Sequence, residues 1–249
     1  MKIDTIKGLV SIIMPAFNAG NTIRESIDSV LQQSYDKYEL IIIDDSSNDE
    51  TRLIIDSYND ARIKVIDNIY SRGARGARQS GIDIALGQYI AFLDSDDLWK
   101  KNKLEIHLNF MKTNQCEFTY SNYTMFSENN KKEFIAQEKI GFFDIIKTCS
   151  IGCLTVVIDR SIISDIKIPD IYKEDYALWV LLLKEFDIFA YNVNYNLASY
   201  RVQKNSLSSN KFKEIKRQYL VLRKIAQLSF TSSLYCLIFY ILNGIRKHS

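Results

Sequence analysis

The stretch YIAFLDSDDLW, residues 89–99, decides the fold class of this chain. Its first five residues are apolar or aromatic, and the run is too short for a helix, so it predicts a strand buried on both faces. Asp94, Asp96 and Asp97 follow directly, and ligands of open α/β sheets bind outside the carboxyl ends of strands. Three neighbouring acids repel one another unless a cation or donor joins them, so we expect a hard divalent metal. A solvated acidic turn, or a helix N-cap at Asp97, is the alternative.

Three more buried runs precede this stretch, and segments with helical spacing separate them. Apolar residues three and four positions apart after residue 21, for example Ile23 and Ile27, fall on one helix face. Strands and helices that alternate in this way predict a mostly parallel sheet with helices on both faces. The predicted strands cover residues 10–14, 40–43, 63–66 and 89–93. One predicted helix starts after residue 21, a second covers residues 50–58, and a third ends near Gly87.

The pattern is less regular after residue 100. Residues 128–139 are polar and predict an exposed excursion, whereas residues 187–191 and 198–201 predict edge strands. Further strands are expected at 118–120 and 154–158, and helices at 104–111, 142–149, 176–186 and 211–228. Residues 234–245 are strongly apolar but shorter than the ~20 residues that a transmembrane helix needs. They fit a helix packed on the core or an interfacial helix with an aromatic and basic rim, and we favour the second.

Composition excludes several classes of protein. The 249 residues fit one large domain, or one domain with an appendage, and 47% of them are hydrophobic, which suits a packed globule. A net charge of +2 gives no sign of nucleic-acid binding. The four cysteines are sparse, Cys149 and Cys153 alone make no zinc site, and no signal peptide is visible. We therefore expect reduced thiols in the cytosol.

Segments of this chain, in their order and spacing, resemble the signature of the family-2 glycosyltransferases. In the first hundred residues these are VSIIMPAFN at 10–18, IIIDDSS at 41–47, Gly73 with ARQSG at 77–81, and residues 89–97. Later, KEDYALW at 173–179 resembles the acidic-pair segment of that family. Tyr200-Arg201 with Ser206-Leu207-Ser208 resembles its closing loop, so the likeness extends to about residue 210.

The resemblance implies an α/β chain with the A-type glycosyltransferase fold. This fold has a Rossmann-like, mostly parallel central sheet flanked by helices, and here a C-terminal helical tail would follow it. The implied glycosyltransferase domain covers residues 1–210. Residues 1–100 would form the nucleotide-sugar half and residues 101–210 the acceptor half. Residues 211–249 would form a basic and apolar helical extension.

The implied donor site begins where the first two strands end. Pro15, Phe17 and Asn18 can supply a rigid turn and an aromatic face for the nucleotide base, and Asp45 can accept from a base N–H. Asp44 is expected to steady the turn or to act beside Asp45. The full nucleotide-sugar-binding set is Pro15, Phe17, Asn18, Asp45, Arg78, Asp94, Ser95, Asp96 and Arg201.

Arg78 stands at the arginine of the family motif, where its fork can donate to a diphosphate or pair with an acid. Gln79 stands where an asparagine is more usual in the family. In the family pattern Asp96 lies nearest the ribose and the metal, and Asp97 or Asp94 completes the coordination. Mn²⁺ or Mg²⁺ is expected, because hard oxygen ligands suit both ions.

Sugar transfer also needs a base that takes the proton of the acceptor hydroxyl. Asp175 is the predicted base and Glu174 is its competitor; burial beside Trp179 would raise the pKa toward working pH, and such a base contributes ~10²–10⁴-fold. An acid-rich helix N-terminus is the alternative. Arg201, Lys204, Ser206 and Ser208 are expected to form a lid over the diphosphate.

These residues predict an inverting glycosyltransferase, because a single displacement inverts the anomeric centre. It would move a sugar from a nucleotide-sugar to a hydroxyl of a saccharide or lipid-linked acceptor. The expected donor is a UDP-sugar. The implied pathway is bacterial surface-polysaccharide synthesis (O-antigen, capsule or teichuronic acid). The implied location is cytoplasmic and peripheral, on the inner face of the membrane, with contact through the C-terminal helix and no nucleic-acid partner.

Alternatives are a non-catalytic nucleotide-sugar-binding relative and a processive polysaccharide synthase. A synthase carries a Gln-x-x-Arg-Trp-like segment and several membrane spans, whereas residues 217–219 read RQY. A sugar-1-phosphate nucleotidyltransferase would want a Gly-rich, basic loop at the position of residues 15–18. A receiver-type signalling domain could use Asp44 and Asp45 as its acidic pocket. However, the single-domain length of that class does not fit a chain of 249 residues with a second acidic cluster at 94–97.

Overall fold

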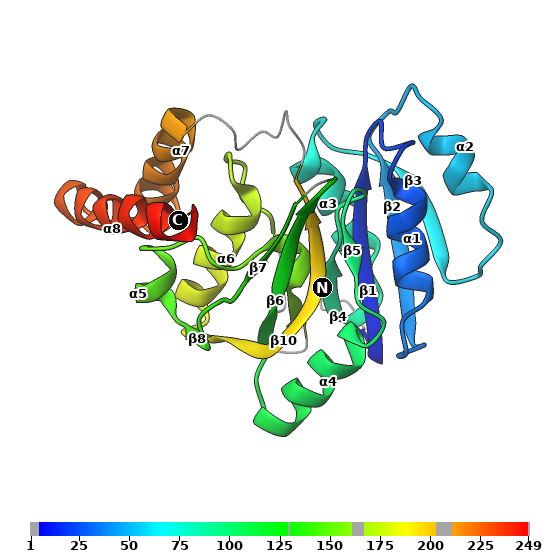
Figure 1. Cartoon of the computed structure of the whole chain (residues 1–249), viewed down its shortest axis with the longest axis horizontal. Helices are drawn as coiled ribbons and strands as arrows, with labels where there is room; N and C mark the ends of the chain where they lie inside the picture. The colour runs from blue at the N-terminus through cyan, green and yellow to red at the C-terminus, as the bar shows by residue number, and fades with distance from the viewer. Residues whose placement is uncertain (1–4, 129, 161–166, 203–210, 249) are drawn as a thin grey trace.

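The four apolar runs of the first hundred residues form parallel strands with helices packed on both faces (Figure 1). The computed structural model describes residues 5–128, 130–160, 167–202 and 211–248. β2 is buried at all seven of its positions, as a central parallel strand should be. The elements are β1 (Ile6–Ala16), α1 (Ile23–Leu31), β2 (Tyr38–Asp44), α2 (Thr51–Asp56), β3 (Ile63–Asp67), α3 (Ala74–Ile84) and β4 (Gly87–Phe92).

The register of these strands brings their carboxyl ends to one edge of the sheet. β1 pairs in parallel with β2 on one side and with β4 on the other. Ala16 lies opposite Asp44, and Ile13 lies opposite Phe92. The acidic residues that follow β2 and β4 therefore leave the sheet next to the end of β1, where the sequence places its donor site.

The second half of the chain continues the same sheet. The strand order is β3-β2-β1-β4-β9-β6-β10-β5, with β7 paired to β6 and β8 to β10. β9 runs antiparallel to both β4 and β6, while β6 and β10 are parallel. The elements are β5 (Leu98–Trp99), α4 (Lys103–Asn114), β6 (Phe118–Ser127), β7 (Asn130–Phe134), β8 (Lys139–Ile140), α5 (Phe142–Ile145), the 3₁₀ turn η1 (Cys153–Thr155), β9 (Val157–Asp159), α6 (Glu174–Glu185), β10 (Ala190–Arg201), α7 (Lys211–Lys224) and α8 (Phe230–His248).

The mostly parallel sheet is confirmed, and the prediction of two edge strands is wrong. The polar excursion at 128–139 is largely exposed, as expected, and it contains β7, which pairs with β6. The two edge strands at 187–191 and 198–201 are one strand, β10, which lies between β6 and β5. The strand expected at 154–158 begins as η1 and becomes β9 at Val157.

The core has one apolar layer on each face of the sheet. One layer contains Ile23 and Ile27 of α1, and the opposite layer contains Ala77 of α3 and Trp179 of α6. Trp179 packs edge-on against Phe92, at 5.8 Å between ring centroids, and against Phe118 at 5.3 Å. These contacts fasten α6 to the strand that carries the acidic stretch.

The two C-terminal helices pack on the layer that contains Trp179. Val221 and Leu222 of α7 have no exposed surface, and Cys236 of α8 is 4% exposed. Both helices lie at the end of the molecule opposite α2 (Figure 1). In the part of the chain that the structure describes, no helix combines the length and the apolar character needed to span a membrane.

Candidate active site

Arg78 joins the acidic stretch after β4 to the start of α6. The Arg78 side chain lies on α3, and the residue is 6% exposed. Its Nη2 donates to Asp94 Oδ1 at 2.5 Å, and its Nη1 donates to Glu174 Oε1 at 2.7 Å. A guanidinium between two carboxylates satisfies charges that would be costly to bury alone. From the sequence, Arg78 could either donate to a diphosphate or pair with an acid. The structure gives Arg78 two acid partners, and its contact with a diphosphate stays a prediction.

Asp175, the predicted base, lies beside this cluster at the start of α6. Its side chain is partly buried, and one oxygen accepts from the backbone amide of Tyr176 at 2.7 Å. Burial and the neighbouring Glu174 raise the pKa of Asp175, while Arg78, the Tyr176 amide and Lys173 lower it less. A carboxyl with a raised pKa is suited to take a proton near neutral pH.

The loop around η1 also faces this cluster. Cys153 is 8% exposed, and burial raises the pKa of its thiol; among the nearby charges Arg78 lowers it, and Asp94 and Asp175 raise it. Trp99 Nε1 donates to the Leu154 carbonyl at 2.8 Å, which holds the same turn from the other side. The loop belongs to the predicted acceptor half, and its Cys153 thiol neighbours the predicted base.

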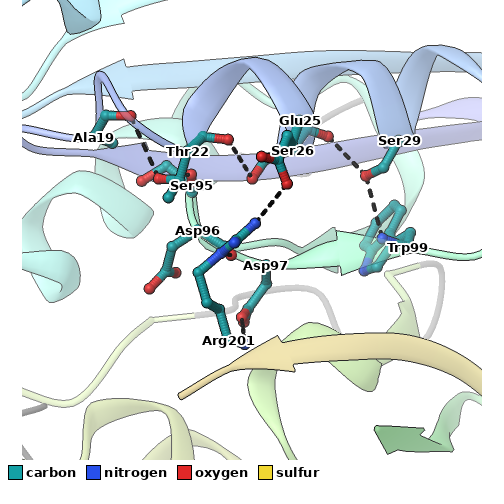
Figure 2. A network of polar contacts seen from close by, with 10 residues as sticks. All are labelled: Ala19, Thr22, Glu25, Ser26, Ser29, Ser95, Asp96, Asp97, Trp99 and Arg201. Atoms are coloured by element: carbon teal, nitrogen blue, oxygen red, sulfur yellow. Dashed lines mark hydrogen bonds and ion pairs between the residues drawn. The ribbon is translucent and has the colours of Figure 1, made fainter. Parts of the chain in front are cut away.

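Helix α1 and the end of β10 hold the backbone of residues 95–97 (Figure 2). Thr22 Oγ1 donates to the Ser95 carbonyl at 2.9 Å, and Arg201 Nε donates to the Asp96 carbonyl at 2.8 Å. The Arg201 guanidinium also pairs with Glu25 at 2.7 Å. Arg201, predicted as a lid residue, is therefore fixed between α1 and the acidic stretch. The other predicted lid residues, Lys204, Ser206 and Ser208, lie outside the described residues.

Asp97 is the most deeply buried acid of the stretch, at 1% exposed. Its Oδ1 accepts from the backbone amide of Arg201 at 2.8 Å, which ties β10 to the acidic turn. Within the described residues, its Oδ2 is buried without a hydrogen-bond partner. Burial raises the pKa of Asp97 well above its ordinary value, Asp94 and Asp96 raise it further, and Arg201 opposes the shift. A side chain in this state has unused capacity for a cation.

The side chains of Asp94, Asp96 and Asp97 do not converge on one point in the structure. In residues 5–128, 130–160, 167–202 and 211–248, no three His, Cys, Asp or Glu side chains are gathered closely enough to hold a metal ion. Asp94 is engaged by Arg78, and Asp97 is turned toward Arg201. The assignment of Asp94, Asp96 and Asp97 as metal ligands stays a prediction.

Asp45 organises the loop beyond β2. Its Oδ1 accepts from Asn68 Nδ2 at 2.6 Å, and its Oδ2 accepts from the Gly73 amide at 2.7 Å. Gly73 has φ 114°, a backbone conformation that favours glycine. Asp44 accepts from the Ser47 amide at 3.0 Å, as a turn residue does. Both oxygens of Asp45 thus have protein partners, and its contact with a nucleotide base stays a prediction.

The residues after β1 form the outer wall of this edge. Phe17 is 55% exposed, so its ring is available to a ligand at the surface. Asn18 has φ 47°, and its Oδ1 accepts from the Asn48 amide at 2.9 Å. Pro15 lies within β1, next to Ile43 of β2. Pro15, Phe17 and Asn18 are therefore at the same edge as Asp45, as predicted.

Several residues that support the site were missed by sequence reasoning. Asn68, one residue past β3, bonds Asp45, and its position at a strand end was a usable signal. Thr22, just before α1, bonds the Ser95 carbonyl, and Glu25 of α1 pairs with Arg201, but nothing in the sequence around them indicates these contacts. Lys173, next to the acidic pair, has left-handed backbone with φ 63°.

A comparison with protein families decides the identity of the chain. The glycosyl transferase family 2 model matches residues 11–164, a span that contains the ends of β1, β2 and β4 together with Arg78. This chain belongs to glycosyl transferase family 2. As a family 2 member it is a glycosyltransferase, and the resemblance seen in its sequence is confirmed.

Relatives of this family 2 chain are similar over almost its whole length. It is 45% identical to UDP-Glc:alpha-D-GlcNAc-diphosphoundecaprenol beta-1,3-glucosyltransferase WfgD of Escherichia coli, over 97% of this chain and 95% of that one. It is 42% identical to the putative teichuronic acid biosynthesis glycosyltransferase TuaG of Bacillus subtilis, over 97% and 98%. The name of the second relative refers to teichuronic acid biosynthesis, one of the pathways expected from the sequence.

Solved structures share the fold. TarS of S. aureus in complex with UDP-GlcNAc superposes with a TM-score of 0.69 at 18% identity, over 92% of this chain and 70% of that one. A mannosyltransferase of Pyrobaculum calidifontis in complex with GDP-Man and Mn²⁺ gives a TM-score of 0.68 at 15% identity, over 95% and 70%. The family 2 chain therefore has the A-type glycosyltransferase fold predicted from its sequence, with added C-terminal helices.

Proposed function

We propose that this chain is an inverting transferase that moves a sugar from a UDP-sugar to a hydroxyl of a lipid-linked saccharide. One observation supports this most: Arg78 bridges Asp94, which follows a donor-side strand, and Glu174, which precedes the predicted base. This bridge brings Asp94 close to the segment of the predicted base, which supports a single site for donor and acceptor. The names of relatives that use UDP-Glc and a diphosphoundecaprenol-linked GlcNAc support the two substrate classes.

In the proposed reaction Asp175 takes the proton of the acceptor hydroxyl. The acceptor oxygen then bonds to the anomeric carbon while the bond from that carbon to the diphosphate breaks, and the centre inverts. Burial and the neighbouring Glu174 raise the pKa of Asp175, so the carboxylate is a stronger base than in solution. Arg78 holds Glu174 in an ion pair, so we assign the proton transfer to Asp175 and not to its neighbour.

The proposed cofactor is Mn²⁺ or Mg²⁺, held by Asp96 with Asp97 and Asp94. The buried Oδ2 of Asp97, which has no hydrogen-bond partner among the described residues, fits this assignment. So does the pKa of Asp97, which burial raises and its two acidic neighbours raise further, because a cation would relieve the repulsion. When bound, such an ion offsets the charge that develops on the diphosphate leaving group.

The proposed location is the inner face of the cytoplasmic membrane, with α8 lying in the interface. One side of α8 is buried at Cys236, and the other side carries exposed apolar side chains at helical spacing. Exposed lysines and arginines of α7 lie on the neighbouring helix, and they suit anionic headgroups. The exposed apolar set is Phe230, Leu234, Tyr235, Ile238, Phe239, Ile241 and Leu242.

A panel of nucleotide-sugars tests the proposed function in two steps. Each donor is first added with Mn²⁺ at about 100 times its Kd; a true donor should raise Tm by about 5–10 °C, from ~2.7 kcal/mol of binding linkage. Stabilising donors are then incubated with a synthetic GlcNAc-diphospho-lipid, and mass spectrometry follows the product. Stabilisation without product would favour the non-catalytic binding alternative. No stabilisation by any donor would reject the proposal.

A matched variant ties the product to the site. Asp175→Asn should keep the Tm increase with the donor and lose most product formation, because it removes the base and leaves the donor side unchanged. Near-normal transfer by Asp175→Asn would show that the base assignment is wrong.

A further inference from the structure

The residues that flank the acidic pair at the start of α6 are bonded to the two C-terminal helices. Lys173 Nζ donates to Gln218 Oε1 of α7 at 2.8 Å and to Tyr240 OH of α8 at 3.2 Å. Glu214 of α7 lies 3.8 Å from the same ammonium. On the other flank, the Tyr176 hydroxyl donates to the Ile145 carbonyl at 2.9 Å.

Gln218 connects the two flanks. The residue has no exposed surface; its Oε1 accepts from Lys173, and its Nε2 donates to Tyr176 OH at 2.6 Å. The ammonium of Lys173 also lies over the Tyr176 ring at 4.9 Å and over the Tyr240 ring at 4.7 Å. Glu174 and Asp175 are thus enclosed between two residues whose side chains are fixed by the C-terminal helices.

The backbone at this point needs such support. Lys173 has φ 63°, which is unfavourable for a residue with a side chain and persists when its surroundings enforce it. Its carbonyl accepts from the Ala177 amide at 2.8 Å, the first bond of α6. The direction in which the Asp175 side chain leaves the helix therefore depends on how Lys173 is held.

We propose that Gln218 and Tyr240 are positioning residues for the reaction, which hold Lys173 and Tyr176 so that Asp175 faces the acceptor. This inference rests on the proposed function, in which Asp175 is the base. It gives the C-terminal helices a role in catalysis that is separate from any contact of α8 with lipid. The tyrosine that bonds Lys173 and the exposed apolar side chains belong to the same helix but to different faces of it.

The pH dependence of the rate distinguishes a positioning role in catalysis from simple support of the fold. The groups facing Asp175 are Glu174 and Lys173 on its own segment, Arg78 from α3, and the Cys153 thiol from η1. Of these, Arg78 lowers the pKa of Asp175 more strongly, and Lys173 lowers it by a smaller amount. If Lys173 loses a bond that holds it, its ammonium becomes less fixed and this lowering weakens. Because the base must be deprotonated, the acidic limb of the pH–rate profile then moves to higher pH.

Tyr240→Phe is the test variant, because it removes one hydroxyl and keeps the ring. Tyr195→Phe is the matched control: it loses the same atom, and Tyr195, on β10, is 58% exposed and lies outside the proposed site and membrane contact. Transfer to the lipid-linked acceptor is measured from pH 5 to 9 for both variants and the unsubstituted protein. We expect Tyr240→Phe to lower kcat by about 10- to 100-fold, the scale of a misplaced catalytic group. Its acidic limb should shift to higher pH, with donor KM and Tm close to normal.

The second measurement is hydrogen exchange over residues 173–180, which needs no activity. Exchange there should rise in Tyr240→Phe and stay unchanged in Tyr195→Phe, because only the first substitution loosens the start of α6. Equal kcat, equal acidic limb and equal exchange in the two variants would overturn the inference while leaving the proposed function intact. Absence of transfer by the unsubstituted protein would overturn the proposed function, and this inference with it.

Discussion

Replacing Arg78 by methionine should destabilise the protein far more than replacing its helix neighbour Arg75. Arg78 is 6% exposed, and it makes ion pairs at 2.5 and 2.7 Å with carboxylates whose side chains are 33% and 21% exposed. Removing one partner of a buried ion pair costs about 3–5 kcal/mol, because the remaining charges lose their compensation. With a urea m value of ~3 kcal/mol/M, the unfolding midpoint should fall by about 1–1.7 M.

Arg75→Met is the control for this experiment. Arg75 pairs with Asp170 at 3.1 Å, but that carboxylate is 86% exposed, and such surface pairs contribute about 0–1 kcal/mol. Trp99 and Trp179, at 5% and 1% exposed, report unfolding through their fluorescence. Midpoints that fall equally in the two variants would refute the reasoning. Adding Glu174→Gln to Arg78→Met should recover part of the loss, since it removes one of the stranded charges.

Five further outcomes are expected. Asp175→Asn should lower kcat by ~10²–10⁴-fold. In the unsubstituted protein, activity should rise with pH through a pKa above the ordinary aspartate value, and a flat profile would contradict this. Asp96→Ala should abolish metal-dependent transfer and leave the urea midpoint unchanged; a variant that Mn²⁺ still activates would exclude Asp96 as a ligand. Gly81→Ala should cost about 1–3 kcal/mol in urea unfolding, because its Cβ would lie 2.8 Å from Ile13 Cγ2 and 2.7 Å from Ile43 Cδ1. Ile238→Lys should weaken cosedimentation with anionic lipid vesicles without lowering Tm; unchanged sedimentation would argue against α8 as the contact.

The first half of the fold could be predicted because its central strands, β2 above all, are buried on both faces. A run such as residues 40–43 has no polar positions, so burial and strand length together leave one interpretation. The position of the acids at the sheet edge could be predicted as well, because each acid directly follows a strand that the sequence reveals. Their site follows from the edge at which parallel strands end, and not from any side-chain contact.

β10 could not be predicted as one inner strand, because asparagines interrupt its apolar pattern. Asn192 is 1% exposed, yet its Nδ2 donates to Asn122 Oδ1 at 2.8 Å and to the Ala136 carbonyl at 3.0 Å. Asn196 similarly donates to Thr124 at 2.8 Å. These partners come from segments some 50 to 70 residues away, so the sequence offers no sign that the polar groups are satisfied.

The same limit applies to charges inside the site. Arg78 and Glu174 are 96 residues apart, and either was readable as a surface charge before the fold brought them together. Lys103 is a clearer case: it has no exposed surface, and its Nζ donates to the Thr155 carbonyl at 2.8 Å and contacts His107 Nε2 at 3.2 Å. Burial lowers the pKa of Lys103 well below its ordinary value. Helical spacing alone would place this residue in solvent.

β9 has a consequence for how such an enzyme can be divided and recombined. It comes late in the chain, yet it is inserted between β4 of the donor half and β6 of the acceptor half. A fragment cut at residue 100 would expose the hydrogen-bonding edge of β4, and bare edges of this kind invite aggregation. Swapping whole halves between relatives would break the β4–β9 ladder as well. New specificities are therefore better sought by exchanging loops at the strand ends, where the shared scaffold stays continuous.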